Sequence, residues 1–336
     1  MRVLVALGGN AMTGPDGSAR PQAQWEAVTG AMEHVAELVR AGHDVVLTHG
    51  NGPQVGNILV QNEFAAHVVP PLPLDWCGAQ TQGTIGYLIL VALESALAGR
   101  GVERPVAAIV SRTLVDSADP GFARPSKPIG RYLPLALAQK LIDHGETWED
   151  RGAKGWRRVV ASPEPLEMLE AHTLRTLLDA GYLVTAAGGG GIPVVRTPDG
   201  RLVGVDAVID KDLTAALLAE RLHADVLVLA TDVEHAMIGY GSPHARPIGR
   251  VSVGEMEQYA AQGHFASGSM GPKVEAALRF VRAGGRSVIT AVHQITAGVA
   301  GAVGTVIDGA PTSPARPTPP EREDSHGDTP IEGQPA

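Results

Sequence analysis

The sequence is poor in cysteine and has no long apolar stretch, and each shortage excludes a class of protein. Cys77 is the only cysteine, so no intramolecular disulfide can form, and the spaced cysteines of a metal site are missing. No uninterrupted apolar run approaches the ~20 residues that span a bilayer, and the short apolar start of the chain lacks the pattern of a signal peptide. We therefore expect a cytoplasmic protein that does not enter a membrane.

Positive charge is also scarce. The chain has 27 lysines and arginines against 36 aspartates and glutamates, a formal net charge of −9. Because binding to a nucleic-acid backbone needs clustered Lys and Arg, nucleic acid is not an expected partner. Any anionic substrate must be held by a local group of cations.

Aliphatic residues, in contrast, are plentiful. Hydrophobic residues make up 44% of the chain and aromatic residues only 4%, so Val, Leu, Ile and Ala must build most of the core. Short β-type runs alternate with longer stretches of helical period, which is typical of a mostly parallel sheet covered by helices. The expected strands are Arg2–Leu7, Asp44–His49, Pro105–Val110, Tyr182–Ala187, Asp225–Ala230 and Arg286–Ala291.

Apolar stripes place two of the helices. From Trp25 to Val39 apolar residues recur at spacings of three and four, and Pro21 suits the first turn of that helix. A second stripe runs from Val274 to Val281, and the glycines at 284 and 285 offer it a C-terminal stop.

The composition of the chain changes in two places. From about 111 to 162, Pro, Gly, Trp and mixed charges interrupt the alternation, which predicts a small subdomain projecting from the main sheet. From 310 to 336 the chain is rich in Pro, Ser, Thr and acidic residues with almost no apolar content, which predicts a disordered tail. The folded domain is therefore expected to span 1–309.

Glycine-rich segments follow several of the expected strands or open an expected helix. Glycine lets backbone amides approach an anion, and a helix N-terminus adds a positive dipole end, so the segments together suggest a phosphate site, although each alone is equally well read as a turn. None has the P-loop spacing. Gly50-x-Gly52-x-x-x-Gly56 comes close to a dinucleotide fingerprint and leaves a nicotinamide-dependent enzyme as an alternative. The segments are Gly8-Gly9-Asn10-Ala11, Gly50-Asn51-Gly52-Pro53, Gly188 to Gly191 and Gly268-Ser269-Met270-Gly271-Pro272-Lys273.

The segment Asp210-Lys211-Asp212 places a cation between two carboxylates directly before a helical stretch. Phosphoryl transfer needs cations against the migrating group and carboxylates that hold those cations or Mg²⁺. The plainer interpretation is a solvated capping turn with Asp210 as the N-cap.

Taken together, these segments resemble the carbamate kinase pattern of the amino-acid-kinase family, and they occur in that family's order from about residue 1 to 309. The absence of lysine from Arg2–Leu7 favours carbamate kinase over other amino-acid kinases. The matching segments are Leu7–Ala11, Thr48–Gly56, Arg124–Gly130, Gly155–Pro163, Ala187–Pro193, Val208–Asp212 and Gly268–Lys273.

The resemblance implies an α/β fold, a three-layer αβα sandwich with a mostly parallel central sheet, and a homodimer. It also implies reversible transfer between ATP and carbamate with Mg²⁺ as cofactor, so the partners are ATP or ADP and carbamate or carbamoyl phosphate. No dedicated protein metal site is expected, since Mg²⁺ is usually held with substrate phosphates. The stretch around Met237 departs from the family, which commonly has an aromatic residue there.

The same resemblance assigns roles to three groups of residues. Lys211 and Lys273 would stabilise the transferring phosphoryl group, Asp212 would orient them, and Lys127 would reach in from the projecting subdomain. The phosphoryl and carbamate side would be cradled by Gly8, Gly9, Asn10, Gly50, Asn51 and Gly52, and the nucleotide would lie by Asp232, Met237, Gly241, Met270 and Pro272.

Other reactive side chains are interpreted as structural. Cys77 is read as a small buried hydrophobe, and His49 is read as hydrogen-bonded at a strand end. Lys154, Arg157 and Arg158 form a basic cluster, either a solvated face or a minor aid in attracting anions. A non-catalytic ligand sensor on the same fold remains an alternative, although the two lysines and Asp212 argue against it.

Overall fold

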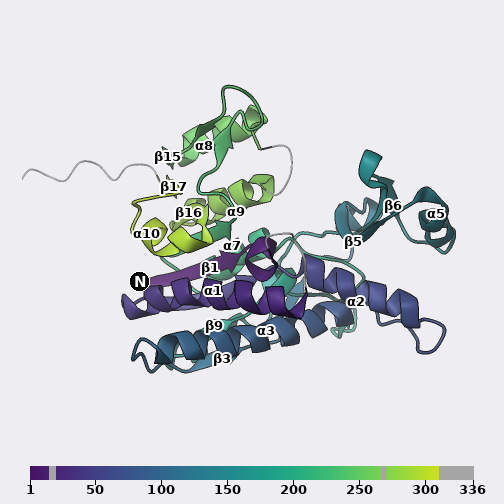
Figure 1. The fold of residues 1–336 in the computed structure, drawn as a ribbon, viewed down its shortest axis with the longest axis horizontal. Helices are drawn as coiled ribbons and strands as arrows, with labels where there is room; N and C mark the ends of the chain where they lie inside the picture. Colours follow the sequence, from purple (N-terminus) through teal and green to yellow (C-terminus); the bar gives the residue numbers. More distant parts are fainter. Residues whose placement is uncertain (15–19, 266–269, 310–336) are drawn as a thin grey trace, which may run out of the picture.

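A computed structural model describes residues 1–14, 20–265 and 270–309 of the chain. The expected tail at 310–336 and the glycine-loop residues Gly268 and Ser269 lie outside the described residues. The described part forms a main body with a small sheet projecting from one side (Figure 1).

The main body is built on an eight-stranded sheet, in which every neighbouring pair is parallel except β16 with β17. Its strand order is β15-β17-β16-β12-β1-β2-β9-β3. The strands are β1 (Arg2–Leu7), β2 (Asp44–His49), β3 (Val106–Ala108), β9 (Leu183–Thr185), β12 (Val226–Thr231), β15 (Arg250–Ser252), β16 (Arg286–Ala291) and β17 (Thr305–Asp308).

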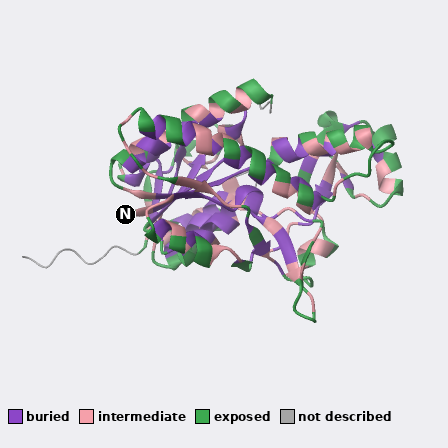
Figure 2. Ribbon diagram, turned by 90° about the horizontal axis from the view of Figure 1, so that it is seen from below, coloured by how far each residue is buried: buried purple, intermediate pink, exposed green. Residues whose placement is uncertain are grey.

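Helices cover both faces of this sheet. Along β1, Val3, Val5 and Leu7 join a buried cluster with residues of α1, α3 and α10, whereas Leu4 and Ala6 join a second cluster with residues of α7 and α9. Alternate residues of a strand point to opposite faces, so the three-layer αβα sandwich is confirmed (Figures 1 and 2). These helices are α1 (Pro21–Arg40), α3 (Leu74–Ala98), α7 (Lys211–Arg221), α9 (Met270–Arg282) and α10 (Ile295–Val299).

The longest helix, α3, is long and apolar enough to cross a membrane by length and composition alone. It packs on the sheet instead, because Ile85, Ile89 and Leu93 are buried in the same core as Val3 and Val5. Half of its most apolar stretch is buried inside the protein. Helix α3 is therefore a core helix of the sandwich.

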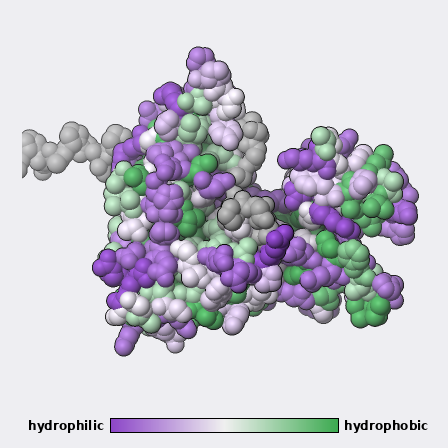
Figure 3. Space-filling view, in the orientation of Figure 1, coloured by the Kyte–Doolittle hydropathy of each residue, from purple (hydrophilic) through white to green (hydrophobic). Residues whose placement is uncertain are grey.

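The projecting sheet is formed by β5 (Lys127–Leu133), β7 (Trp156–Val160) and β6 (Trp148–Asp150), with α5 (Leu135–Asp143) between β5 and β6. We call residues 127–160 the lid. The lid has a small core of its own around Leu133, Ala138 and Trp148, and Figure 3 shows it standing apart from the upper part of the body.

A second small sheet, not anticipated from the sequence, lies beside the main one in the order β11-β10-β4-β8. It includes Arg112–Leu114, at the start of the segment that was expected to project. Its strands are β4 (Arg112–Leu114), β8 (Glu167–Met168), β10 (Ile192–Arg196) and β11 (Leu202–Gly204).

The remaining described elements are short or lie outside the sheets already described. They are α2 (Gly52–Ala65), α4 (Pro120–Ala123), α6 (Ala171–Asp179), α8 (Val253–Ala261), β13 (Met237–Ile238), β14 (Arg246–Pro247) and the short 3-10 turns Gly9–Met12, Gly152–Lys154, Gly188–Gly190 and Val292–Gln294.

Candidate active site

The loops after β1 and β2 lie against each other at the carboxyl edge of the sheet. The Gly8 amide donates to the Ala230 oxygen at 2.9 Å, and the Gly50 amide donates to the Leu7 oxygen at 3.0 Å. A Cβ atom added to Gly50 would lie 3.2 Å from the Gly9 nitrogen and 3.3 Å from Lys211 Cδ. The absence of a side chain at Gly50 therefore lets the first loop and the stem of Lys211 approach it.

Helix α7 brings the predicted lysines together on one carboxylate. Asp212 accepts hydrogen bonds from Lys211 Nζ at 2.6 Å and from Lys273 Nζ at 3.0 Å, one on each oxygen. Asp212 and Lys273 are only 4% and 3% exposed. Because Lys273 comes from the first turn of α9, the carboxylate joins two helices as well as two cations.

Burial and charge act in opposite directions on this cluster. Burial by itself raises the pKa of Asp212, but the ammonium groups of Lys211 and Lys273 outweigh it and leave that pKa below its usual value. Burial and repulsion by Lys211 lower the pKa of Lys273, which Asp212 only partly offsets. The arrangement concentrates positive charge where little water screens it, which strengthens its hold on an anion.

Lys127 joins the same region from the lid. Its Nζ donates to Asp210 Oδ2 at 2.6 Å, and Asp210 is the residue immediately before Lys211. Lys127 of the lid thus reaches the N-terminus of α7, the helix that begins with Lys211. The lid also lies close to α2, since a Cβ on Gly56 would lie 3.4 Å from Gly130 Cα.

The Gly188–Gly191 loop is a buried junction rather than an open anion loop. All four residues are buried, and Gly189 to Gly191 have positive φ angles. A Cβ on Gly188 would lie 2.5 Å from the His49 ring, and one on Gly189 would lie 2.2 Å from Asn51 Nδ2. The glycines therefore let this loop pack beneath the residues that follow β2.

His49 and Asn51 are held in fixed positions by that packing. The His49 Nδ1 lies 2.9 Å from the Gly50 oxygen, and Asn51 Nδ2 donates to Thr81 Oγ1 at 2.8 Å. Complete burial lowers the pKa of His49 to about 4, so the ring is neutral near pH 7 and its Nδ1 donates. This agrees with the structural interpretation of His49.

The residues expected near the nucleotide lie directly after β12, in β13 and the turn that follows it, and in the first turn of α9. Asp232 directly follows β12, where Thr231 Oγ1 donates to Asp232 Oδ1 at 3.0 Å. Met270 and Pro272 lie in the first turn of α9, and Met270 packs against the same hydrophobic cluster as Ile238, the neighbour of Met237. Gly241 has a φ of 79° in the turn after β13.

A cavity of about 690 Å³ lies between the lid and the body beside α2, and the sequence did not reveal it. Arg20, Arg131 and Arg157 line it, and no acidic residue does so among the described residues. Of the expected basic cluster, Arg157 thus faces this cavity, whereas Arg158 pairs with Glu146. The arginines come from three separate elements, so only the tertiary structure brings them together.

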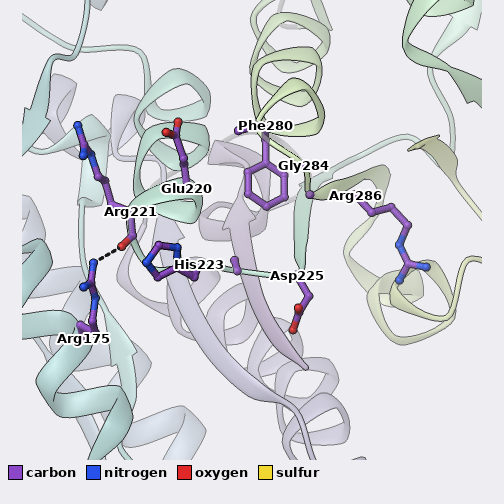
Figure 4. Close-up of a pocket in the computed structure, with 11 residues that line it drawn as sticks. Arg175, Glu220, Arg221, His223, Asp225, Phe280, Gly284 and Arg286 are labelled. Atoms are coloured by element: carbon purple, nitrogen blue, oxygen red, sulfur yellow. Dashed lines mark hydrogen bonds between the residues drawn. The ribbon is translucent and has the colours of Figure 1, made fainter. Parts of the chain in front are cut away.

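A second cavity, of about 780 Å³, lies at the opposite edge of the sheet, beside Asp225 and Arg286 at the amino ends of β12 and β16 (Figure 4). One of its cations, Arg175, already serves the fold. Arg175 donates to the Arg221 oxygen at 2.6 Å, at the C-terminus of α7, where a cation complements the helix dipole. Ligands of open α/β sheets bind at the carboxyl ends of the strands, so this cavity is not the candidate active site.

Cys77 also has the structural character expected of it. It is buried, accepts a hydrogen bond from Asn62 Nδ2 at 3.5 Å, and burial raises the pKa of its thiol. A thiol with a raised pKa is a poor nucleophile.

Comparison with known proteins agrees with this geometry. The sequence profile of the amino acid kinase family matches residues 1–291. Carbamate kinase of Thermococcus kodakarensis is 45% identical over 91% of this chain and 98% of its own length, and the carbamate kinase-like protein YahI of Escherichia coli has the same identity and coverage. The structure of carbamate kinase from Giardia lamblia bound to AMP-PNP superposes with a TM-score of 0.86 at 41% identity, covering 92% of this chain and 98% of that one. The chain therefore belongs to the carbamate kinases of the amino acid kinase family.

Proposed function

We propose that this protein is a carbamate kinase that transfers a phosphoryl group reversibly between ATP and carbamate. In one direction carbamoyl phosphate and ADP give ATP and carbamate, and the carbamate decomposes to ammonia and CO₂. The observation that carries the proposal is the buried cluster in which Asp212 holds Lys211 and Lys273 beside the Gly50 loop. The family match leaves the nicotinamide-dependent alternative without support.

The cluster suits the chemistry of phosphoryl transfer. The transition state spreads negative charge over the transferring group, so preorganised cations stabilise it more than they stabilise the substrate. Lys211 and Lys273 would supply those cations, Asp212 would orient them, and Lys127 would approach from the lid. Backbone amides around Gly8, Gly9, Asn10, Gly50, Asn51 and Gly52 would bind the phosphoryl and carbamate side.

The nucleotide would lie on the neighbouring part of the same edge. Gly8 bonds to Ala230 at the end of β12, so a phosphate held by the first loop is close to Asp232. Met237, Gly241, Met270 and Pro272 would then surround the rest of the nucleotide. Arg20 and Arg157 of the cavity beside the lid would attract the anionic substrates, whereas Arg131 is paired with Glu63 at 2.7 Å.

Mg²⁺ is the proposed cofactor, and it would neutralise charge on the nucleotide phosphates. The described residues contain no cluster of three or more His, Cys, Asp or Glu arranged for a metal, and both oxygens of Asp212 accept hydrogen bonds from lysines. The metal would therefore be held mainly by phosphates and water, as is common for this ion.

Two further features remain proposals. We propose a homodimer formed through the edge strand β3 and the adjoining surface of α3, where Trp76 and Tyr87 are 60% and 63% exposed. We also propose a cytoplasmic location, since the lone cysteine suits a reducing compartment.

The test is ATP formation from MgADP and carbamoyl phosphate. We expect turnover that depends on both substrates and stops when EDTA removes the divalent metal. A properly folded protein that forms no ATP above background would reject the catalytic proposal in favour of a ligand sensor. Full activity in EDTA would reject the role of Mg²⁺.

A further inference from the structure

Asp210 is connected to two parts of the molecule at once. Its Oδ1 accepts hydrogen bonds from the backbone amides of Asp212 at 2.9 Å and Leu213 at 3.3 Å, so Asp210 is the N-cap of α7. Its Oδ2 accepts a hydrogen bond from Lys127 Nζ at 2.6 Å. Capping requires only one side-chain oxygen, so the second oxygen is available for a different task.

That second contact ties the lid to the catalytic helix. Lys127 is the first residue of β5 in the lid, whereas Asp210 adjoins Lys211 and Asp212 in the body. The side chain of Asp210 is only 13% exposed and that of Lys127 is 33% exposed, so this ion pair is shielded more than an ordinary surface pair. Shielding and the short distance make the contact strong enough to hold one geometry.

The contact also fixes a side chain that would otherwise move freely. A lysine side chain has four rotatable bonds, and fixing them when substrate binds costs conformational entropy, which weakens binding. An ammonium group has three donors, so Lys127 can bond to Asp210 and still present donors to an incoming anion. Two carboxylates, Asp210 and Asp212, thereby arrange three lysines around one helix N-terminus.

We propose that Asp210 is a positioning residue that holds Lys127, and with it the lid, over the phosphoryl-transfer centre before substrate binds. The proposal rests on the proposed carbamate kinase function and adds a residue to it. Asp210 acts through Lys127 and does not touch the substrate itself. Without the Oδ2 contact, the lid and its lysine would have to be ordered during each binding event.

The direct test is Asp210→Ser, because serine keeps a capping oxygen but has no second oxygen for Lys127. We expect kcat/KM for carbamoyl phosphate to fall about tenfold, as for one lost charge-assisted hydrogen bond, while ADP affinity measured by calorimetry stays within about twofold. Asp210→Asn, which keeps the shape of the side chain, serves as a second variant if the serine protein folds poorly. Asp119→Ser is the matched control, because Asp119 caps α4 with one oxygen and uses the other on the Glu164 backbone amide rather than on a lysine.

A double-mutant cycle separates positioning from a merely structural role. In a Lys127→Ala background the substitution at Asp210 should have no further effect on kcat/KM, since its target is gone. Equal effects in both backgrounds would overturn the proposal.

Amide hydrogen exchange tests the same contact without any turnover. Residues 127–133 should exchange faster in Asp210→Ser and Lys127→Ala than in the parent protein, while the exchange of α7 should not change. This measurement remains informative even if the protein makes no ATP. It therefore distinguishes failure of the proposed contact between Asp210 and Lys127 from failure of the enzymatic proposal. Unchanged exchange of β5 in both variants would also overturn the proposal.

Discussion

At the scale of single residues, the two lysines bound to Asp212 differ in burial. The Lys273 side chain is 4% exposed and the Lys211 side chain 17% exposed. Removing a partner from a buried pair leaves an uncompensated charge and costs about 3 to 5 kcal/mol. Asp212 retains one lysine in either variant, so the structural cost should be larger for the more buried Lys273.

We therefore predict that Lys211→Ala lowers kcat by about 10² to 10³, the usual cost of one lost electrostatic partner, with little change in melting temperature. Lys273→Met should lower kcat to a similar extent and also lower the melting temperature. Steady-state kinetics and thermal unfolding would be measured on both proteins. A Lys211→Ala protein with normal kcat would show that this residue has no catalytic role, and one that unfolds would show a structural role.

His49 makes folding stability depend on pH. Burial lowers its pKa from 6.5 to about 4, so between these values the unfolded chain binds a proton that the folded protein does not. Stability is then fully present above about pH 6.5 and decreases as the pH falls toward 4, by about 1.4 kcal/mol per pH unit.

Replacing His49 with glutamine should reduce this acid sensitivity, although the variant is less stable at pH 7.5 because the buried ring packs against the Gly188 loop. Urea unfolding at pH 7.5 and pH 5 would measure the difference. His43→Gln is the control, because the pKa of His43 is also lowered, by burial first, but its ring is far less buried. If the unfolding free energy of His49→Gln depends on pH as strongly as that of the parent protein, His49 is not the source of the acid sensitivity.

At the scale of elements, much of the main sheet was predictable from the sequence. Strands β1, β2 and β16 have the predicted bounds, since each contains a short buried run of β-branched and aliphatic residues that ends at a helix or loop signal. The small sheet of β4, β8, β10 and β11 was not predictable, because its strands have two to five residues and pair across distant parts of the chain. Short strands of this kind carry too little periodicity to be recognised.

The site was predictable to a similar extent. Motifs identified Lys211, Asp212 and Lys273, and the structure joins them by hydrogen bonds. The contact of Lys127 with Asp210 and the grouping of arginines beside α2 arise only when the lid folds against the body. No spacing along the sequence encodes those contacts.

The Gly188–Gly191 loop offers a test of close packing between elements. We predict that Gly189→Ala destabilises the protein by more than Gly200→Ala does, because both glycines have positive φ angles but only Gly189 has a neighbour, Asn51, where the Cβ would lie. Gly200→Ala should cost about 1 kcal/mol from backbone strain alone. Urea unfolding would measure both, and equal costs would show that Asn51 moves aside freely.

At the scale of the whole molecule, the exposed edge of the sheet favours a second copy as partner. β3 is the last strand of the order and has hydrogen-bonded neighbours on one side only. α3 packs tightly beside it, since a Cβ on Gly86 would lie 3.0 Å from Ala108 Cβ. Tyr87, next to Gly86, is 63% exposed, and Val110 beyond the edge strand is 57% exposed. Exposed apolar groups of this kind, beside an open strand edge, are typical of an interface.

We predict that the chain of 34.9 kDa has about twice this mass in solution and that Tyr87→Glu converts it to a monomer, because a charge cannot be buried at the centre of an apolar interface without a partner. Light scattering coupled to size-exclusion chromatography would measure the mass of each protein. Leu137→Glu is the control, since Leu137 is also exposed, at 49%, but lies on α5 of the lid. If the parent protein is monomeric, or if Leu137→Glu rather than Tyr87→Glu dissociates it, the edge formed by β3 and α3 is not the dimer interface.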